Sequence, residues 1–230
     1  MSASIVVAGE ELLLLPEKAA YRPSIKQLLV ADLHLGKATH FRKSGIAVPH
    51  AAHTGTLQRL RMLTEMYDAE SIAVLGDFFH SDINTEWNYF VQWMQEIQIP
   101  VKLITGNHDL HLLRSASVSE TEFCGDALLS PPFILQHHPE TVMDKRGYFR
   151  IAGHVHPGYL LRGKARQRVS LSCFHLQPHQ LVLPAFGEFT GKEIITPEAN
   201  DRVFVIAGNA VSEVSNLRDF YGKKQLFFLI

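Results

Sequence analysis

The chain has only two cysteines, Cys124 and Cys173, and they lie far apart in the sequence. This excludes a disulfide framework and a CxxC zinc site, so we expect a protein of the reducing cytoplasm. A long hydrophobic run is also missing from the first residues, MSASIVVAGEELLLLPEKAA, where acidic residues interrupt the apolar stretch and no positive segment precedes it. We therefore expect neither a signal peptide nor a membrane span there.

The chain also has no excess of charge of one sign. Its 22 lysines and arginines are balanced by 23 aspartates and glutamates, and the formal net charge is −1. A protein that holds nucleic acid through a global basic field is therefore excluded, and any polyanion must be bound locally. No low-complexity segment or Pro/Gly/Ser linker divides the 230 residues, so we expect one globular domain over residues 1–230.

Apolar runs and helical periodicity indicate the class of fold. Short runs rich in Leu, Val and Ile predict strands at residues 4–8, 12–15, 27–31, 71–75, 101–105, 132–136, 148–152, 169–173, 180–183 and 202–207. Apolar spacing predicts helices over residues 49–67 and 84–97. Strand and helix alternate in the first half, which implies βαβ units, whereas the second half implies hairpins. The mixture favours an α/β sandwich of two sheets with helices outside.

Nearly every predicted strand of the first half ends at residues that can bind a metal. These ends are Asp32-x-His34, Gly76-Asp77, Gly106-Asn107-His108-Asp109, His137-His138 and Gly153-His154-x-His156. Ligands bind at the carboxyl ends of strands in open α/β sheets, so five such ends can converge on one place. Each end alone is weak evidence, because an aspartate after a strand is often a helix cap or a turn former. Their joint, ordered occurrence is much harder to explain by chance.

The pair His154 and His156 raises a geometric question of its own. If strand geometry persists through them, their side chains point to the same face and can bind neighbouring atoms of one site. The pair alone decides little, because the chain has 13 histidines and many histidines are surface residues.

The number and type of donors point to two metal ions. The candidate ligands are Asp32, His34, Asp77, Asn107, His137, His154 and His156. Seven donors are too many for one tetrahedral zinc, but they suit two ions about 3.5–4 Å apart that share a carboxylate. Imidazole mixed with carboxylate and amide oxygen suits Mn²⁺, Fe or Zn²⁺ better than Mg²⁺ or Ca²⁺. Such a centre keeps a net positive charge, which favours an anionic substrate.

These donors also predict a reaction. Water bound to two metals loses a proton near neutral pH and becomes a nucleophile, while the ions polarise the oxygens of the substrate. That chemistry fits in-line attack on phosphorus, so we expect phosphate ester hydrolysis. The leaving oxygen needs a proton, and His108 is placed beside Asn107 to supply it as a general acid. Asp109 can then orient the imidazole of His108.

The five blocks, taken in order from residue 32 to residue 156, resemble the calcineurin-like metallophosphoesterases. The resemblance implies a four-layer α/β/β/α sandwich of two mixed sheets with a di-metal site at the sheet edges. It implies that one metal is held by Asp32, His34 and His156, the other by Asn107, His137 and His154, with Asp77 bridging and His108 catalytic. The family commonly has glycine after the isolated histidine, where this chain has His138. Either His137 or His138 can therefore be the ligand, and we favour His137.

The sequence around the blocks resembles a bacterial subgroup, the ligase-associated DNA damage response endonucleases. The stretches that carry this likeness are DLHLGKATHFRKSGIAVP, LGDFFHS, IAGHVHPGYLLRGKARQRVSLSCF and LVLPAFGEFTG. The likeness implies a nucleic-acid phosphodiester substrate, with an ATP-dependent DNA ligase and a helicase as partners in DNA repair. We therefore expect a nuclease in which a metal-bridging hydroxide attacks phosphorus and His108 protonates the leaving oxygen.

Basic residues follow the first and last metal motifs, and each cation near a phosphate path adds counterion release to binding. We expect Lys37, Arg42 and Arg166 to contact the substrate, although solvation at the surface is the alternative for any one of them. Two other functions stay open. A small-molecule phosphoesterase, such as a nucleotide-sugar pyrophosphatase or a phosphomonoesterase, usually needs a capping segment, and no obvious insertion provides one. A non-catalytic scaffold should lack a ligand or the catalytic histidine, and none is missing.

Overall fold

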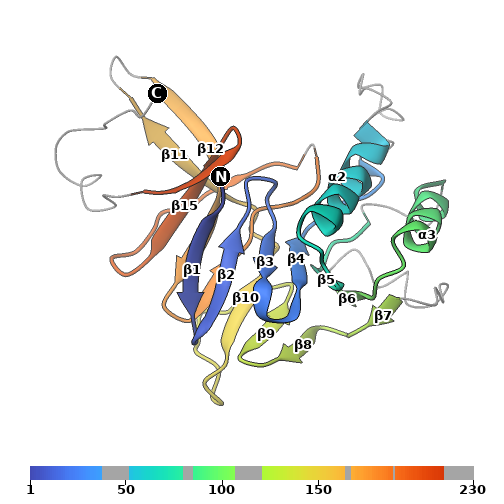
Figure 1. Ribbon diagram of the computed structural model, residues 1–230. Coiled ribbons are helices and arrows are strands. Elements are labelled where there is room, and N and C mark those ends of the chain that lie inside the picture. Colours follow the sequence, from blue (N-terminus) through green and yellow to red (C-terminus); the bar gives the residue numbers. More distant parts are fainter. Residues whose placement is uncertain (38–51, 80–84, 107–120, 164–166, 189, 215–230) are drawn as a thin grey trace.

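The computed structural model describes residues 1–37, 52–79, 85–106, 121–163, 167–188 and 190–214. Within these ranges the chain forms two mixed β-sheets and two α-helices (Figure 1). No helix in these ranges is long and apolar enough to cross a bilayer. Cys124 and Cys173 are both free.

The first sheet has seven strands in the order β1-β2-β3-β4-β5-β6-β7. Its antiparallel half is β1 (Ala3–Val7), β2 (Glu10–Leu14), β3 (Ala20–Arg22) and β4 (Gln27–Ala31), with a short 3-10 helix, η1 (Pro23–Ile25), before β4. Its parallel half continues from β4 to β5 (Ser71–Leu75), β6 (Val101–Ile104) and β7 (Thr121–Phe123). Helices α2 (Ala52–Met66) and α3 (Thr85–Ile97) lie between these parallel strands in the chain, so the predicted βαβ units are confirmed.

The second sheet has nine strands. Seven of its strands have the order β14-β11-β12-β13-β10-β9-β8. Strand β15 also pairs with β12, and β16 pairs with β15. The strands are β8 (Ala127–Ser130), β9 (Phe133–Gln136), β10 (Phe149–Ala152), β11 (Pro157–Arg162), β12 (Arg168–Gln177), β13 (Gln180–Val182), β14 (Glu193–Ile194), β15 (Arg202–Ala207) and β16 (Ala210–Glu213). Strands β9, β10 and β13 are parallel, and β11 and β12 form a hairpin, as the second half of the sequence implies.

The alternation of side chains along β4 shows how the layers are built. Leu28 and Val30 are fully buried against the helices, in a cluster with side chains of α2 and α3. Leu29 and Ala31 are buried on the other face, against side chains of the second sheet such as Phe133. Because both faces of β4 are covered, the strand reads as a continuous apolar run rather than as an alternating one.

The outer face of the second sheet is covered differently. Arg150, which is buried, donates a 2.6 Å hydrogen bond to the carbonyl of Val142 and pairs at 3.0 Å with Glu140. Gln180 accepts a hydrogen bond from the backbone N–H of Glu140. The connection from β9 to β10 is thus held over this face, while both α-helices of the described ranges pack on the first sheet. The predicted fold class, with its two mixed sheets, is confirmed.

The strand predictions differ from the structure mainly where strands are short. Residues 27–31, 71–75 and 202–207 match β4, β5 and β15 to the residue, whereas β3, β7, β8, β11, β14 and β16 are missing from the prediction. Strand β11 begins with Pro157 and Gly158, two residues that usually interrupt strands. Its pairing with β12, five residues long, holds it in the sheet nevertheless.

Candidate metal centre

The candidate ligands follow the carboxyl ends of strands from both sheets. Asp32 and His34 follow β4 and Asp77 follows β5, in the first sheet; His137 follows β9 and His154 follows β10, in the second. The backbone N–H of His154 donates a 2.9 Å hydrogen bond to Oδ2 of Asp32, which ties the two sheet edges together. The predicted convergence therefore occurs for every candidate ligand that the structure describes.

The first group of ligands, which we call the first lobe, consists of Asp32, His34 and His156. Nε2 of His156 lies 3.4 Å from Nε2 of His34 and 3.4 Å from Oδ1 of Asp32. Two donors bound to one metal at about 2.1 Å, with an angle between 90° and 109° at the metal, lie about 3.0–3.4 Å apart. The spacing of the first lobe therefore fits three ligands of one ion.

The second lobe consists of Asp77, His137 and His154. Nε2 of His137 lies 3.1 Å from Nδ1 of His154 and 3.6 Å from Oδ1 of Asp77. Donor atoms of Asp77, Asp32 and His137 all lie within 4.8 Å of one another. Asp77 thus lies beside His137 of the second lobe and close to Asp32 of the first lobe, as a carboxylate shared by two ions would.

Asp32 provides the test of whether these residues fit metal ions. Its side chain is fully buried, and within the described ranges its Oδ1 accepts no hydrogen bond. A buried carboxylate oxygen that accepts no hydrogen bond is costly, and a cation beside Oδ1 would remove that cost. The donors are carboxylate oxygens and imidazole nitrogens, a set that suits Mn²⁺, Fe or Zn²⁺. The residues therefore fit two divalent ions.

The choice between His137 and His138 depends on a hydrogen bond. Nδ1 of His137 lies 3.0 Å from the carbonyl oxygen of Leu75. A carbonyl only accepts, so Nδ1 carries the proton and the lone pair of Nε2 faces Asp77 and His154. His138 is exposed, with its ring 4.2 Å from that of His154. This geometry favours His137 as the ligand, and a donor atom of the exposed His138 lies within 4.8 Å of donor atoms of His137 and His154 at the solvent side of the second lobe.

The backbone at the ligands is unusual. Ten described non-glycine residues have a positive φ, and five of them are Asp32, His34, Asp77, His154 and His156. Such conformations are disfavoured for residues with a side chain, and they concentrate where function requires them. The assumption that strand geometry persists through His154 and His156 is therefore wrong: β10 ends at Ala152, and both histidines have left-handed backbones. The turn directs His154 to the second lobe and His156 to the first.

Two glycines before ligands are required by close packing, a signal that sequence reasoning missed. A Cβ at Gly76 would lie 2.2 Å from Nδ1 of His137. A Cβ at Gly153 would lie 2.7 Å from Oδ2 of Asp32. Each glycine thus makes room for a ligand that comes from the opposite sheet. The recurrence of glycine before Asp77, Asn107 and His154 could have indicated this crowding.

Sequence reasoning also missed the segment 183–187, which joins the two sheets at the site. The backbone N–H of Leu183 donates to the carbonyl of Ala152, and that of Phe186 donates to the carbonyl of Ala31, each at 2.8 Å. The N–H of Gly187 continues this contact to the carbonyl of Asp32 at 3.0 Å. The segment therefore fixes the ends of β10 and β4, where ligands of both lobes begin.

Burial and neighbouring charges shift the pKa values of His154 and Lys37 at the centre. Partial burial lowers the pKa of His154, and the neighbouring His137 and His138 lower it further, which favours the neutral form that can bind a metal. Burial also lowers the pKa of Lys37, while the carboxylates of Asp77 and Asp32 act in the opposite direction. The ammonium of Lys37 is thus partly buried and lies within the field of both carboxylates.

Part of the predicted site lies outside the described residues: Asn107, His108, Asp109, Arg42 and Arg166. Gly106, which precedes Asn107, is described and packs against the second lobe. A Cβ there would lie 2.2 Å from the backbone nitrogen of Asp77. Strand β6 therefore brings the chain directly to Asp77 before Asn107 begins.

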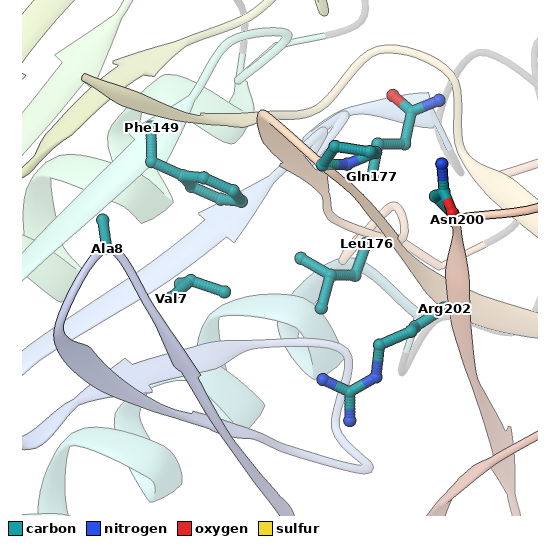
Figure 2. Close-up of a pocket in the computed structure, with 8 residues that line it drawn as sticks. Val7, Ala8, Phe149, Leu176, Gln177, Asn200 and Arg202 are labelled. Carbon is teal, nitrogen blue, oxygen red and sulfur yellow. The ribbon is translucent and has the colours of Figure 1, made fainter. Parts of the chain in front are cut away.

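A separate cavity of about 260 Å³ lies elsewhere on the molecule (Figure 2). It is lined by Val7, Ala8, Phe149, Leu176, Gln177, Pro178, Asn200 and Arg202. Phe149 begins β10, and the ligands follow the end of that strand, so the cavity lies at the opposite end of the sheet from the metal centre. None of the candidate ligands lines it.

Comparisons with known proteins agree with this geometry. Residues 25–226 match the sequence profile of the calcineurin-like phosphoesterases. Among solved structures, the chain is similar to the nuclease MPE of Pseudomonas putida, with 31% sequence identity and a TM-score of 0.77. The match covers 93% of this chain and 100% of that chain. A comparison with curated proteins found no match.

Proposed function

Because the chain belongs to the calcineurin-like phosphoesterase family and is a metal-dependent phosphoesterase, we propose that it is a nuclease that cleaves phosphodiester bonds of nucleic acid. The observation that carries the proposal is the pair of lobes at metal-ligand spacing with Asp77 between them. The similar Pseudomonas protein is a nuclease, and the likeness extends over its whole length.

The proposed roles of the residues follow the two lobes. Asp32, His34 and His156 would hold one ion, His137, His154 and Asn107 would hold the other, and Asp77 would be shared by both. When bound, two divalent ions would lower the pKa of a bound water molecule and polarise the phosphoryl oxygens. His108 is proposed to protonate the leaving oxygen, with Asp109 orienting its imidazole. We expect Mn²⁺ in both positions, and Fe or Zn²⁺ suits the same donors.

Lys37 is proposed to position the substrate phosphate. Its backbone N–H donates to the carbonyl of His34 at 3.2 Å, which fixes the backbone of Lys37 relative to the first lobe. A cation beside two carboxylates and two metal ions is well placed to bind a phosphoryl oxygen. Arg42 and Arg166 are proposed to contact the flanking phosphates.

The proposed setting comes from the resemblance to the ligase-associated endonucleases. We propose that residues 1–230 act as one catalytic domain in the cytoplasm, in DNA repair, together with an ATP-dependent DNA ligase and a helicase. The substrate is then DNA, and RNA is the alternative that the same centre would accept.

The test is hydrolysis of bis(p-nitrophenyl) phosphate beside p-nitrophenyl phosphate, by protein that is stripped with chelator and reloaded with Mn²⁺. Asp77→Asn is the control, because it keeps the shape of the side chain but removes the charge between the lobes. Cleavage of the diester that needs both Mn²⁺ and Asp77 supports the proposal, and oligonucleotides are then the next substrates. Preference for the monoester would indicate a small-molecule phosphatase. Inactivity on diester, monoester and oligonucleotide would indicate a scaffold and contradict the proposal.

A further inference from the structure

The hairpin of β11 and β12 begins at the metal centre and leads away from it. Pro157, the first residue of β11, directly follows His156 of the first lobe. In Figure 1, β11 and β12 extend from the sandwich on the side away from the two helices. Arg162 follows His156 by six residues in the sequence. At a rise of about 3.3 Å per residue, the end of β11 lies about 20 Å from the first lobe.

The two faces of this hairpin differ in chemistry. Tyr159 and Leu161 of β11 and Leu171 of β12 lie on one face and pack in an apolar cluster with Val203 and Val205 of β15. The cross-strand pairs of the other face are Gly158 with Ser172, Leu160 with Ser170, and Arg162 with Arg168. The first face therefore packs against β15 within the fold. We call the second one the arm face.

The arm face carries positive charge without acidic neighbours along the hairpin. Residues 157–177 contain four lysines and arginines and no aspartate or glutamate, although the whole chain has slightly more acids than bases. Arg162 and Arg168 are both exposed and lie directly opposite each other. Like charges in this position destabilise a sheet. Within the described ranges, no carboxylate lies within ion-pair distance of either guanidinium.

Lys192 adds a cation at the end of the arm face that is nearer the metal centre. A Cβ at Gly158 would lie 2.9 Å from Cβ of Lys192, so Lys192 covers Gly158 on this face. Its ammonium donates a 2.9 Å hydrogen bond to the carbonyl of Ser170 on β12. Glu193, the next residue, pairs with Pro157 and by alternation points to the other face. The cations thus run from Lys192 outward to Arg162 and Arg168.

We infer that the arm face binds the sugar–phosphate backbone of the substrate strand, about six nucleotides from the bond that is cut. This inference rests on the proposed function and adds a substrate-binding surface to it. A polyanion relieves the repulsion between Arg162 and Arg168, and the small side chains of Ser170 and Ser172 let a strand approach β12 closely. A reach of about 20 Å corresponds to about six steps of 3.4 Å along a strand whose bases are stacked as in B-DNA.

The experiment compares the double variant Arg162→Gln/Arg168→Gln with a control of equal net charge, Lys145→Gln/Arg146→Gln, in the exposed β9–β10 connection. Binding of a fluorescent 20-nucleotide single-stranded DNA is measured by anisotropy with metal-stripped protein, from about 50 to 200 mM salt. We expect the arm variant to bind roughly tenfold more weakly and to lower the slope of log K against log salt by about 1.4, because each lost phosphate contact on a single strand removes about 0.7. The control should behave as the unmodified protein does.

Hydrolysis separates this inference from the proposed function. Bis(p-nitrophenyl) phosphate and a dinucleotide are too short to reach Arg162 and Arg168 from the metal centre, so the arm variant should cleave them at the unmodified rate, which also shows that it is folded. Equal affinity and equal slope for the arm variant and the unmodified protein would overturn the inference, even if every diester is cleaved normally. If no diester is cleaved by any of the proteins, the proposed function fails, and the binding data still decide on the arm face.

Discussion

Substitution of Gly76 by alanine tests how the second lobe is built. Gly76 has a φ of +74°, and an added Cβ would lie 2.2 Å from Nδ1 and 2.7 Å from Cβ of His137. Gly9 is a matched control, because its φ is +79° and nothing lies within 4 Å of an added Cβ. Gly9→Ala therefore carries the backbone penalty alone, whereas Gly76→Ala carries the same penalty and a collision with His137.

The two effects have different magnitudes. Alanine in the left-handed region costs about 1 kcal/mol, which is the whole expected effect of Gly9→Ala. Forcing His137 to move adds about 1–3 kcal/mol of overpacking, and losing its hydrogen bond to Leu75 adds about 1 kcal/mol. We therefore expect Gly76→Ala to lower the free energy of unfolding by about 2–4 kcal/mol more than Gly9→Ala does.

Gly76→Ala should weaken metal binding at the second lobe only. The carbonyl of Leu75 fixes the tautomer and the orientation of His137, and loss of such a contact lowers metal affinity about 10–100-fold. Urea denaturation of the metal-stripped proteins gives the stability, and calorimetric titration with Mn²⁺ gives the two affinities. The reasoning is refuted if Gly76→Ala and Gly9→Ala lose equal stability and both keep two sites of unchanged affinity.

Three further predictions concern single side chains. His137→Ala should remove the second Mn²⁺ in a calorimetric titration, whereas His138→Ala should keep both ions; the opposite result would assign the ligand to His138. Lys37→Ala should raise KM for a diester about tenfold with two ions still bound, because a hydrogen bond from a charged donor is lost; an unchanged KM would exclude Lys37 from substrate binding. Arg22→Met should cost about 3 kcal/mol in urea denaturation, because the buried Arg22 bonds to Glu10 and to the carbonyl of Pro131. The hydrogen bond from Arg22 lowers the pKa of Glu10, so this contribution is present at neutral pH and is lost as the pH falls through the lowered pKa of Glu10. A cost that does not depend on pH would contradict the pairing.

How much of the site could be predicted from sequence depends on whether the signal is local. Asp32 and Asp77 end apolar runs that match β4 and β5 to the residue, so their positions could be predicted. The left-handed backbone at His154 and His156 could not be predicted, because the end of the strand at Ala152 does not fix the backbone conformation of the residues that follow it. Segment 183–187 was missed for another reason. Its contacts to Ala31 and Ala152 join residues that lie far apart in the chain.

The two sheets supply different parts of the metal centre. The first sheet contributes both described carboxylates, Asp32 and Asp77, together with His34, whereas the second contributes the imidazoles of His137, His154 and His156. Neither sheet alone has a complete lobe, because the described ligands of each lobe come from both sheets. The centre therefore forms only when the sheets are packed together, and ions bound to both lobes stabilise that packing because they bind the folded chain and not the unfolded one.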